Sequence, residues 1–396
     1  MFLVFLHTIL FSSMHLLEKI FEELIQCNAT VYLTLAMVMA LVKAPLTPEY
    51  KPYRRAKRLL VGAYLFFSAN LFAWCFLTKG EWNVYDYYIE CADVILFYLE
   101  DLFICYAFFS LLNKRYATRR RMMIDAGLWL LTCALSVSAI IPTFLPYRDI
   151  FRLSALTLYI AFIVRFVYTY IRQYQASVRR LDNYYSNNMH GMIQWTGTSV
   201  ILMAVSWFLA IMTMFQGVYF NLLVQVYIIG LYIYIAVSFL NFSRQYIQVQ
   251  KAIEEEPDTA EVPTDLEKRL QAWVKEKVFL KQQFSIDDLA VALGTNTNYL
   301  SCLINEKYRT NFSAWISSLR IAEAKRLMLE SPELKMENIA YSVGFSSASY
   351  FSKVFSLQEG ISPAVWAQWK FSGDKHKSLQ VDTERTFHQR YPLAML

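Results

Sequence analysis

Two short stretches in the last third of the chain carry side chains that can read the edges of DNA bases. Asparagine can pair bidentately with adenine, and short hydroxyl side chains reach bases or phosphates. An apolar face at Leu300 and Leu303 turns the polar side chains of the first stretch outward, and a plain solvated helix face is the alternative interpretation. The candidate base-reading residues are Thr297, Asn298, Ser301, Cys302 and Asn305 in the first stretch, and Ser347, Ala348, Ser349, Ser352, Lys353 and Ser356 in the second.

Each stretch follows a shorter helix and a glycine turn. Ser285 precedes Asp287 and Asp288 as an expected N-cap with an acidic first turn, and the apolar face of that helix ends at Gly294. Helix, glycine turn and second helix form the helix-turn-helix signature. The same spacing recurs further along the chain: Leu289, Ala290, Leu293, Gly294 and Leu300 correspond to Ile339, Ala340, Val343, Gly344 and Tyr350.

One long helix is predicted between the two units, from Phe312 to Glu330, and it stops before Pro332. Its length of about 28 Å is near the roughly 34 Å between successive major-groove faces on one side of DNA. It therefore fits a rigid spacer between two DNA readers. The residues expected near one stripe of this helix are Trp315, Leu319, Ala322, Arg326 and Leu329. The aromatic residues expected in the core are Trp315, Phe345, Tyr350, Phe351, Phe355 and Trp366.

Four runs of sequence carry a family resemblance: LRIAEAKRL at 319–327, IAYSVGF at 339–345, SYFSKVF at 349–355 and GISP at 360–363. On these runs, residues 266–370 resemble the DNA-binding domain of the AraC/XylS family of bacterial transcription regulators, in which a helix joins two helix-turn-helix units. The resemblance implies sequence-specific binding of double-stranded promoter DNA by the second helix of each unit, usually under a separate sensory domain. For an activator it also implies RNA polymerase as a partner.

The chain also departs from that family pattern by losing basic residues. Cys302 stands where members often carry an arginine, and Ser356, Leu357 and Ala367 replace further basic side chains. Thirteen basic and eleven acidic residues between 264 and 371 leave a net charge of only +2. Because nonspecific DNA affinity comes mainly from phosphate contacts, we expect that affinity to be small.

The chain as a whole is too apolar for an ordinary soluble protein. Of its 396 residues 56% are hydrophobic and 18% are charged, against about 25% charged in an average soluble domain. A bilayer needs about 20 apolar helical residues. Seven stretches qualify: 24–42, 59–78, 91–112, 124–145, 150–171, 192–215 and 218–242. The apolar residues 1–17 are either an eighth, interfacial segment or an upstream extension, so 1–23 stays a segment of open role.

Basic residues predict the orientation of these seven segments, because Lys and Arg near helix ends stay on the cytoplasmic side. The loops 43–58, 113–123 and 172–191 hold fourteen basic residues, whereas the opposite loops hold only Lys79 and Arg148. The N-terminus is therefore expected outside and the C-terminal domain in the cytoplasm. The location predicted is the bacterial cytoplasmic membrane.

A short linker, residues 243–263, is expected between the membrane domain, 24–242, and the DNA-binding domain, 264–371; residues 372–396 form a tail. Apolar residues at alternating spacings of three and four predict one stripe on a helix leaving the membrane. That stripe is either an interfacial helix end or the seam of a homodimer. Its members are Phe239, Phe242, Tyr246, Val249 and Ile253.

Ionisable residues at membrane depth mark a second candidate site, because they normally face a partner or a cavity. The third segment carries Asp93, Glu100 and Asp101, and the fifth carries Arg165. One interpretation is a polar, ligand-responsive pocket. The other is an ion pair or a set of hydrogen bonds that holds the bundle together.

The predicted fold class is all-α, a polytopic transmembrane helix bundle followed by a double helix-turn-helix domain. The predicted function is a membrane-embedded one-component transcription regulator, with promoter DNA, membrane lipid, an unknown small-molecule signal and a second copy of the chain as partners. No enzyme activity or cofactor is expected, and the six cysteines show no zinc or disulfide spacing. A transporter or channel with a cytoplasmic regulatory tail is the alternative.

Overall fold

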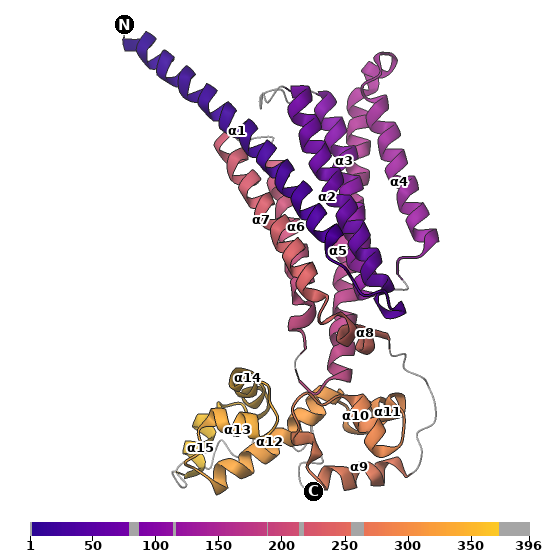
Figure 1. Cartoon of the computed structure of the whole chain (residues 1–396), viewed down its shortest axis with the longest axis vertical. Coiled ribbons are helices and arrows are strands. Elements are labelled where there is room, and N and C mark those ends of the chain that lie inside the picture. The colour runs from indigo at the N-terminus through magenta and orange to yellow at the C-terminus, as the bar shows by residue number, and fades with distance from the viewer. Residues whose placement is uncertain are drawn as a thin grey trace. The chain divides into compact units, whose positions relative to one another are not determined.

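The computed structural model describes residues 2–78, 87–113, 116–187, 189–213, 218–254 and 265–371. Within these ranges the regular elements are helices and no strand occurs, which confirms the all-α prediction (Figure 1). The chain divides into two compact units. The first contains residues 1–176 and 192–248, and the second contains residues 177–191 and 249–396.

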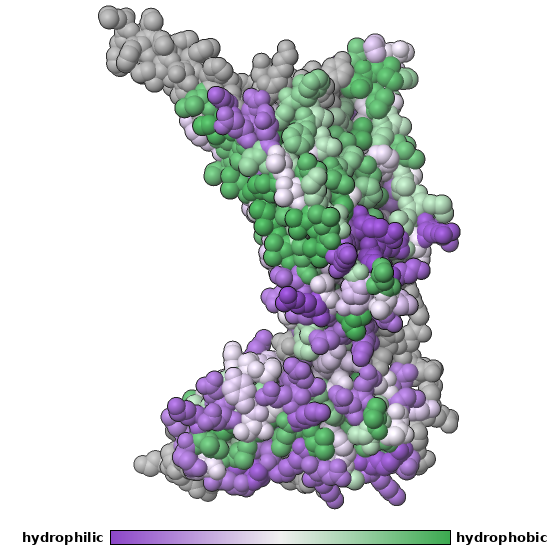
Figure 2. All heavy atoms as spheres, in the orientation of Figure 1, coloured by the Kyte–Doolittle hydropathy of each residue, from purple (hydrophilic) through white to green (hydrophobic). Residues whose placement is uncertain are grey.

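The first unit is a bundle of seven long helices, each long and apolar enough to cross a membrane by length and composition. Figure 2 shows apolar side chains gathered over the visible face of this bundle. Six of the predicted stretches are confirmed as helices in their described residues, whereas the fourth, 124–145, is α-helical only to Ser138. The seven helices keep the order of the predicted stretches. They are α1 (Phe2–Leu41), α2 (Lys51–Thr78), α3 (Tyr87–Leu112), α4 (Arg119–Ser138), α5 (Arg148–Tyr184), α6 (Gly191–Thr213) and α7 (Val218–Phe242), with 3-10 turns η1 (Pro48–Tyr50) and η2 (Pro142–Tyr147).

Helices α1 and α5 extend furthest beyond the stretches that the sequence pattern predicts. The apolar N-terminal residues continue directly into α1, so within the described residues they form no separate element. Helix α5 runs 37 residues and ends at Tyr184, although its apolar pattern stops at Ile171. The prediction that Arg172, Arg179 and Arg180 lie in a loop is therefore wrong. Residues 172–184 contain no glycine or proline that would end the helix.

Hydroxyl side chains tie the first helices to α7. The Tyr64 hydroxyl of α2 donates to the Tyr232 carbonyl of α7 at 2.6 Å, and the Ser68 hydroxyl donates to the Ala29 carbonyl of α1 at 2.7 Å. The ring of Tyr32 lies 5.0 Å from that of Tyr232, centroid to centroid. Interhelical hydrogen bonds and close packing replace the hydrophobic driving force between helices in lipid.

The expected stripe leaving the membrane is interrupted. Helix α7 ends at Phe242, a three-residue turn follows, and α8 covers Tyr246–Glu254. The prediction of one continuous helix is therefore wrong, although all five members of the stripe are buried. The ring of Tyr246 packs 5.3 Å from Tyr50 and 5.4 Å from Tyr53. The residues of the stripe are therefore packed against other residues of the same chain.

In its described residues, the second unit contains seven α-helices after its α8 segment. Helix α12 covers the predicted range from Phe312 to Glu330, and Figure 1 shows it running between α10 and α11 on one side and α13 to α15 on the other. The elements are α9 (Leu266–Lys275), η3 (Val278–Leu280), α10 (Ile286–Leu293), α11 (Thr297–Tyr308), α12 (Phe312–Glu330), α13 (Met336–Ser342), α14 (Ala348–Glu359) and α15 (Pro363–Phe371).

The buried face of α12 differs from the stripe proposed from its sequence. Trp315 is buried as expected, but Arg326 and Leu329 are exposed. The core side of this helix includes Ile316, Ile321, Ala324 and Met328, with Arg320 among them. The sequence stripe fails because α12 contacts elements on both of its sides, so its buried residues span more than one stripe.

Candidate nucleic-acid interface

The first helix-turn-helix unit consists of α10, a turn at Gly294 and α11. Ser285 caps α10 as predicted: its hydroxyl accepts from the Asp288 amide, and the Asp288 carboxylate accepts from the Ser285 amide. Gly294 follows α10 with a positive φ of 60°. The Asn296 side chain then caps α11 by accepting from the Tyr299 amide at 2.8 Å. Local sequence signals therefore set where α11 begins.

The candidate reading residues of α11 lie away from its buried face. Leu300, Ile304 and Tyr308 are buried, whereas Asn305 is exposed. The Asn305 amide donates to the Ser301 hydroxyl at 3.3 Å, so these two polar groups lie side by side on the helix. The candidates that are half-buried are Thr297, Asn298, Ser301 and Cys302.

Cys302 takes a local partner on α11. Its thiol forms a hydrogen bond with Glu306, and this bond raises the pKa of the thiol above its ordinary value. The side chain is therefore a neutral thiol at physiological pH. It cannot supply the positive charge that an arginine would bring to this position.

The second unit consists of α13, a turn at Gly344 and α14. Gly344 has a φ of 91°. The Ser347 hydroxyl accepts from the Tyr350 amide at 3.2 Å and so caps α14. Ser349 and Lys353 are exposed, and Ala348, Ser352 and Ser356 are half-buried. Ser347 thus positions the start of α14, and Ser349 and Lys353 are the exposed candidates on this helix.

An aromatic core fixes α14 against α12, α13 and α15. Phe345, Phe351, Phe355 and Trp366 are all buried, as predicted, while Tyr350 is half-buried. The Phe345 and Phe351 rings meet edge to face at 5.3 Å. A rigid support of this kind keeps the exposed face of α14 in a defined orientation.

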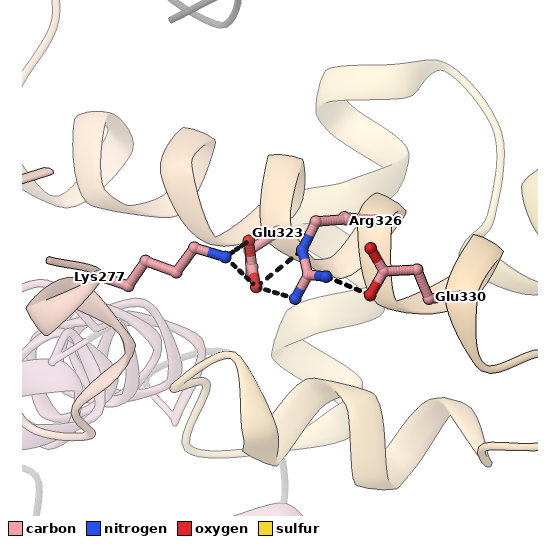
Figure 3. A network of polar contacts seen from close by, with 4 residues as sticks. All are labelled: Lys277, Glu323, Arg326 and Glu330. Atoms are coloured by element: carbon pink, nitrogen blue, oxygen red, sulfur yellow. Dashed lines mark hydrogen bonds and ion pairs between the residues drawn. The ribbon is translucent and has the colours of Figure 1, made fainter. Parts of the chain in front are cut away.

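Ion pairs on α12 bind Lys277, which lies between α9 and η3, before the first helix-turn-helix unit (Figure 3). The Lys277 ammonium pairs with the Glu323 carboxylate at 2.9 Å, and Arg326 pairs with the same carboxylate at 2.6 Å and also with Glu330. Hydrogen bonding to Arg326, together with Lys277, holds the pKa of Glu323 below its ordinary value of 4.5. The network thus joins residue 277 to the spacer helix.

We expect the stability of this domain to fall in acid partly because of Glu323. A carboxyl with a lowered folded pKa stabilises the protein fully above its unfolded pKa, here 4.5, and loses that contribution as the pH falls through the lower folded value. Glu323→Gln should cost about 1 kcal/mol at pH 7, since both cations are half exposed, and less in acid. The measurement is the urea concentration at which α12 amides lose protection, at pH 7 and below pH 4.5, with Glu330→Gln as the control. An equal cost at both pH values would contradict this prediction.

Sequence reasoning missed Arg320, which lies at the centre of the domain. Its side chain is 0% exposed. The guanidinium donates to the Phe279 carbonyl at 2.9 Å and to the Lys281 carbonyl at 2.8 Å. Burial lowers its pKa to about 10, so it remains charged near neutrality. The available signal was an arginine flanked by apolar residues on the buried side of α12.

The membrane candidates Glu100 and Asp101 are buried and join four helices. Asp101 of α3 accepts from the Tyr159 hydroxyl of α5 at 2.7 Å and from the Trp207 indole of α6 at 3.0 Å. Glu100 accepts from the Tyr232 hydroxyl of α7. Of the two interpretations of these residues, a ligand pocket or contacts between helices, the structure shows hydrogen bonds between helices. Asp93 is half-buried.

Arg165 of α5 pairs with an acid outside the candidate set. It pairs with Asp125 of α4, whose other oxygen accepts from the Tyr106 hydroxyl at 2.6 Å. Asp125 is a buried acid that was not among the candidate residues, and the pair is an ion pair between α4 and α5. A cavity of about 280 Å³ adjoins this pair, and it is lined by Tyr116, Arg121, Ile124, Asp125, Arg165 and Thr169. No cluster of metal-ligating residues occurs in the described ranges.

Comparison with known proteins agrees with the geometry of the two units. The helix-turn-helix domain family matches residues 289–368, which run from α10 into α15 and include both candidate reading helices. The C-terminal domain is an AraC-type helix-turn-helix domain. The matched region begins after α9 and contains Gly294, Gly344 and the whole of α12.

Relatives of the helix-turn-helix domain are transcription regulators. The chain is 34% identical over 123 residues to the regulator YisR of Bacillus subtilis, covering 31% of this chain and 40% of YisR. It is 32% identical over 102 residues to ExsA of Pseudomonas aeruginosa, covering 26% and 36%. It is 35% identical over 66 residues to the transcriptional activator RhaR of Cronobacter sakazakii, covering 17% and 23%. The chain thus spans less than half of each of these relatives, and no solved structure matches it.

Proposed function

We propose that this protein is a membrane-embedded, one-component transcription regulator that binds promoter DNA through α11 and α14 under the control of its seven-helix unit. The observation that carries the proposal is the presence of an AraC-type helix-turn-helix domain and seven helices of membrane-spanning character on one chain. No second protein would then be needed to relay a signal from the membrane to DNA.

The two reading faces support sequence-specific rather than only electrostatic binding. Asn305, Ser349 and Lys353 are exposed on α11 and α14, and short polar side chains surround them. Helix α12 has 19 residues and so spans about 28 Å, close to the roughly 34 Å between successive major-groove faces. Two units joined by such a spacer suit two consecutive major-groove segments of one promoter. RNA polymerase would be a further partner if the protein activates transcription.

The distribution of basic residues supports an orientation with the DNA-binding domain in the cytoplasm. The clusters at 51–58, 119–121 and 172–180 lie at the ends of α2, α4 and α5. Since Lys and Arg near helix ends stay inside, all three helix ends would face the chromosome. A fluorescent protein fused to the C-terminus should then fluoresce, whereas an alkaline phosphatase fusion there should be inactive.

The hydrogen-bonded centre at Glu100 and Asp101 supports α3, α5, α6 and α7 as the helices that respond to a signal. These carboxylates join all four helices through three aromatic side chains, Tyr159, Trp207 and Tyr232. Polar groups at membrane depth are usually functional or structurally essential. A signal that changes this centre would move helices that are linked covalently to the DNA-binding domain.

Chromatin immunoprecipitation with the intact, tagged protein tests the proposal. We expect enrichment of a small set of promoter regions, each about tenfold or more above the genome background, because specific sites are bound far more tightly than nonspecific DNA. The control is the same protein truncated after residue 254, which keeps α1 to α8 and removes the helix-turn-helix domain. Equal profiles for the two proteins would refute DNA binding.

A further inference from the structure

The segment that connects α5 to α6 packs on the helix-turn-helix domain. We call residues 177–191 the connector; they belong to the same compact unit as the domain. Tyr185 and Ser285 form an antiparallel bridge, and the Ser186 amide donates to the Phe284 carbonyl at 2.9 Å. Ser285 is the N-cap of α10. The connector therefore hydrogen-bonds to the main chain where the first helix-turn-helix unit begins.

Two side chains in the first half of the connector add further attachments. The Tyr184 hydroxyl donates to the Asp287 carboxylate in the first turn of α10. The Arg180 guanidinium donates to the Ile253 carbonyl of α8 at 2.7 Å. The last turns of α5 are thus held both by the start of α10 and by the helix that leads into the domain.

The strongest attachment is to the buried arginine of α12. Arg320 donates to the Asn187 side-chain oxygen at 2.8 Å and to the Ser186 hydroxyl at 3.3 Å. Ser186 is 0% exposed and Asn187 is 4% exposed. A buried guanidinium requires acceptors for its N–H groups. Phe279 and Lys281 supply two carbonyls, and the connector supplies two further acceptors to a cation that lies inside the domain.

Arg320 also contacts the turn of the second unit. A Cβ atom added to Gly344 would lie 3.0 Å from the Arg320 Nε atom. The guanidinium carbon lies 5.8 Å from the centre of the Phe345 ring. The Arg320 side chain thus contacts the connector, the segment before the first helix-turn-helix unit and the turn of the second helix-turn-helix unit. A shift of the connector would therefore change the surroundings of both helix-turn-helix units.

The docked connector leaves the reading faces accessible. Asn305, Ser349 and Lys353 are exposed in the same structure in which Ser186 and Asn187 are buried. Contact with the connector is therefore compatible with DNA binding. Its effect is to fix the geometry of the two units and not to cover them.

We propose that the connector is a regulatory clamp: when it is docked on Arg320 and α10 it holds the two helix-turn-helix units in their DNA-binding arrangement, and the membrane helices α5 and α6 control DNA affinity by engaging or withdrawing it. This proposal rests on the proposed function and names the route of its regulation. The route runs through the connector and Arg320, in addition to the chain connection through α8.

Two connector asparagines give a matched pair of variants for the test. Asn187→Ala removes an acceptor from Arg320, whereas Asn183→Ala makes the same chemical change one turn earlier, at a half-buried position. In the full-length protein in lipid nanodiscs, Asn187→Ala should speed amide exchange in residues 279–287 by about threefold or more, with exchange in α9 unchanged. Promoter enrichment by chromatin immunoprecipitation should fall by a similar factor. Asn183→Ala should leave both unchanged.

Asn187→Asp provides a variant with the opposite expected effect. Among the described residues, the Asn187 amide nitrogen has no hydrogen-bond acceptor, so replacing it with oxygen loses no bond. The new carboxylate would face the Arg320 guanidinium, and charge-assisted hydrogen bonds are about twice as strong as neutral ones. Exchange in residues 279–287 should slow, and promoter enrichment should equal or exceed that of the natural protein.

The two readouts separate this proposal from the proposed function. Unchanged exchange in Asn187→Ala would show that the connector does not hold the domain, and faster exchange with unchanged enrichment would show that the clamp does not regulate; either result overturns the proposal. If the natural protein enriches no promoter, the proposed function fails and the regulatory role with it. The exchange data would still decide whether the connector docks.

Discussion

Replacing Gly344 with alanine should abolish the DNA-binding arrangement of the second helix-turn-helix unit. The residue has a φ of 91°, which side chains other than glycine rarely adopt, and an added Cβ would lie 2.4 Å from the Leu280 carbonyl oxygen. Left-handed backbone strain and overpacking each cost about 1–3 kcal/mol. The neighbour that would have to move is main chain, so relief by a side-chain rotation is excluded. The expected loss of stability is thus about 3 kcal/mol or more.

Gly294→Ala is the matched control in the first unit. Gly294 also has positive φ, 60°, but the nearest atom to an added Cβ is the end of the Arg269 side chain at 3.7 Å. Only the backbone strain of about 1–2 kcal/mol should remain. The measurement is the urea concentration at which α12 and α14 amides lose protection in the full-length protein. Equal shifts for the two variants would mean that the close approach to Leu280 is not what requires glycine at 344.

Placing negative charge on the reading faces should remove promoter occupancy by more than about tenfold. Changing Asn298, Asn305 and Lys353 together to Glu replaces two amides that can pair with adenine and the one cation among the candidate residues. A good bidentate base contact contributes about 1–3 kcal/mol of discrimination, and glutamate repels the phosphates. Chromatin immunoprecipitation with the intact protein measures the loss.

The matching control changes the same net charge elsewhere in the domain. Lys268→Glu with Lys275→Glu alters two exposed residues of α9, which precedes the family match at 289–368. This variant should keep most of its promoter enrichment. If it loses as much as the triple variant, total charge and not the faces of α11 and α14 governs binding. Unchanged enrichment in the triple variant would mean that a different surface reads DNA.

The helices were predictable wherever a local signal ends them. Ser285, Gly294 and Pro332 mark helix boundaries by capping and by steric exclusion, and α10 and α12 begin or end accordingly. Helix α5 was predicted too short because hydropathy reports where apolar residues stop and not where hydrogen bonding stops. The break between α7 and α8 was missed because the residues between them contain neither glycine nor proline.

The outward polar faces of α11 and α14 could be inferred from sequence because they depend on helix periodicity alone. The partners of Arg165 and Arg320 could not, since each depends on which elements meet in space. The fifth segment offered Arg165 three carboxylates on α3, yet its partner is Asp125 on α4. Arg320 is bound by residues from 186–187 and from 279–281, which lie far apart along the chain. No periodicity connects such positions.

The near-neutral surface of the DNA-binding domain has a consequence for how such a regulator finds its genes. With a net charge of +2 between residues 264 and 371, few counterions are displaced from DNA, so sliding along the double helix contributes little to the search. If the protein is embedded in a membrane as proposed, its DNA-binding domain is confined to a thin layer and its local concentration there is raised. Its operons would then be sampled when the nucleoid brings them to the cell periphery, and relocating one to a distant chromosomal position should slow its response.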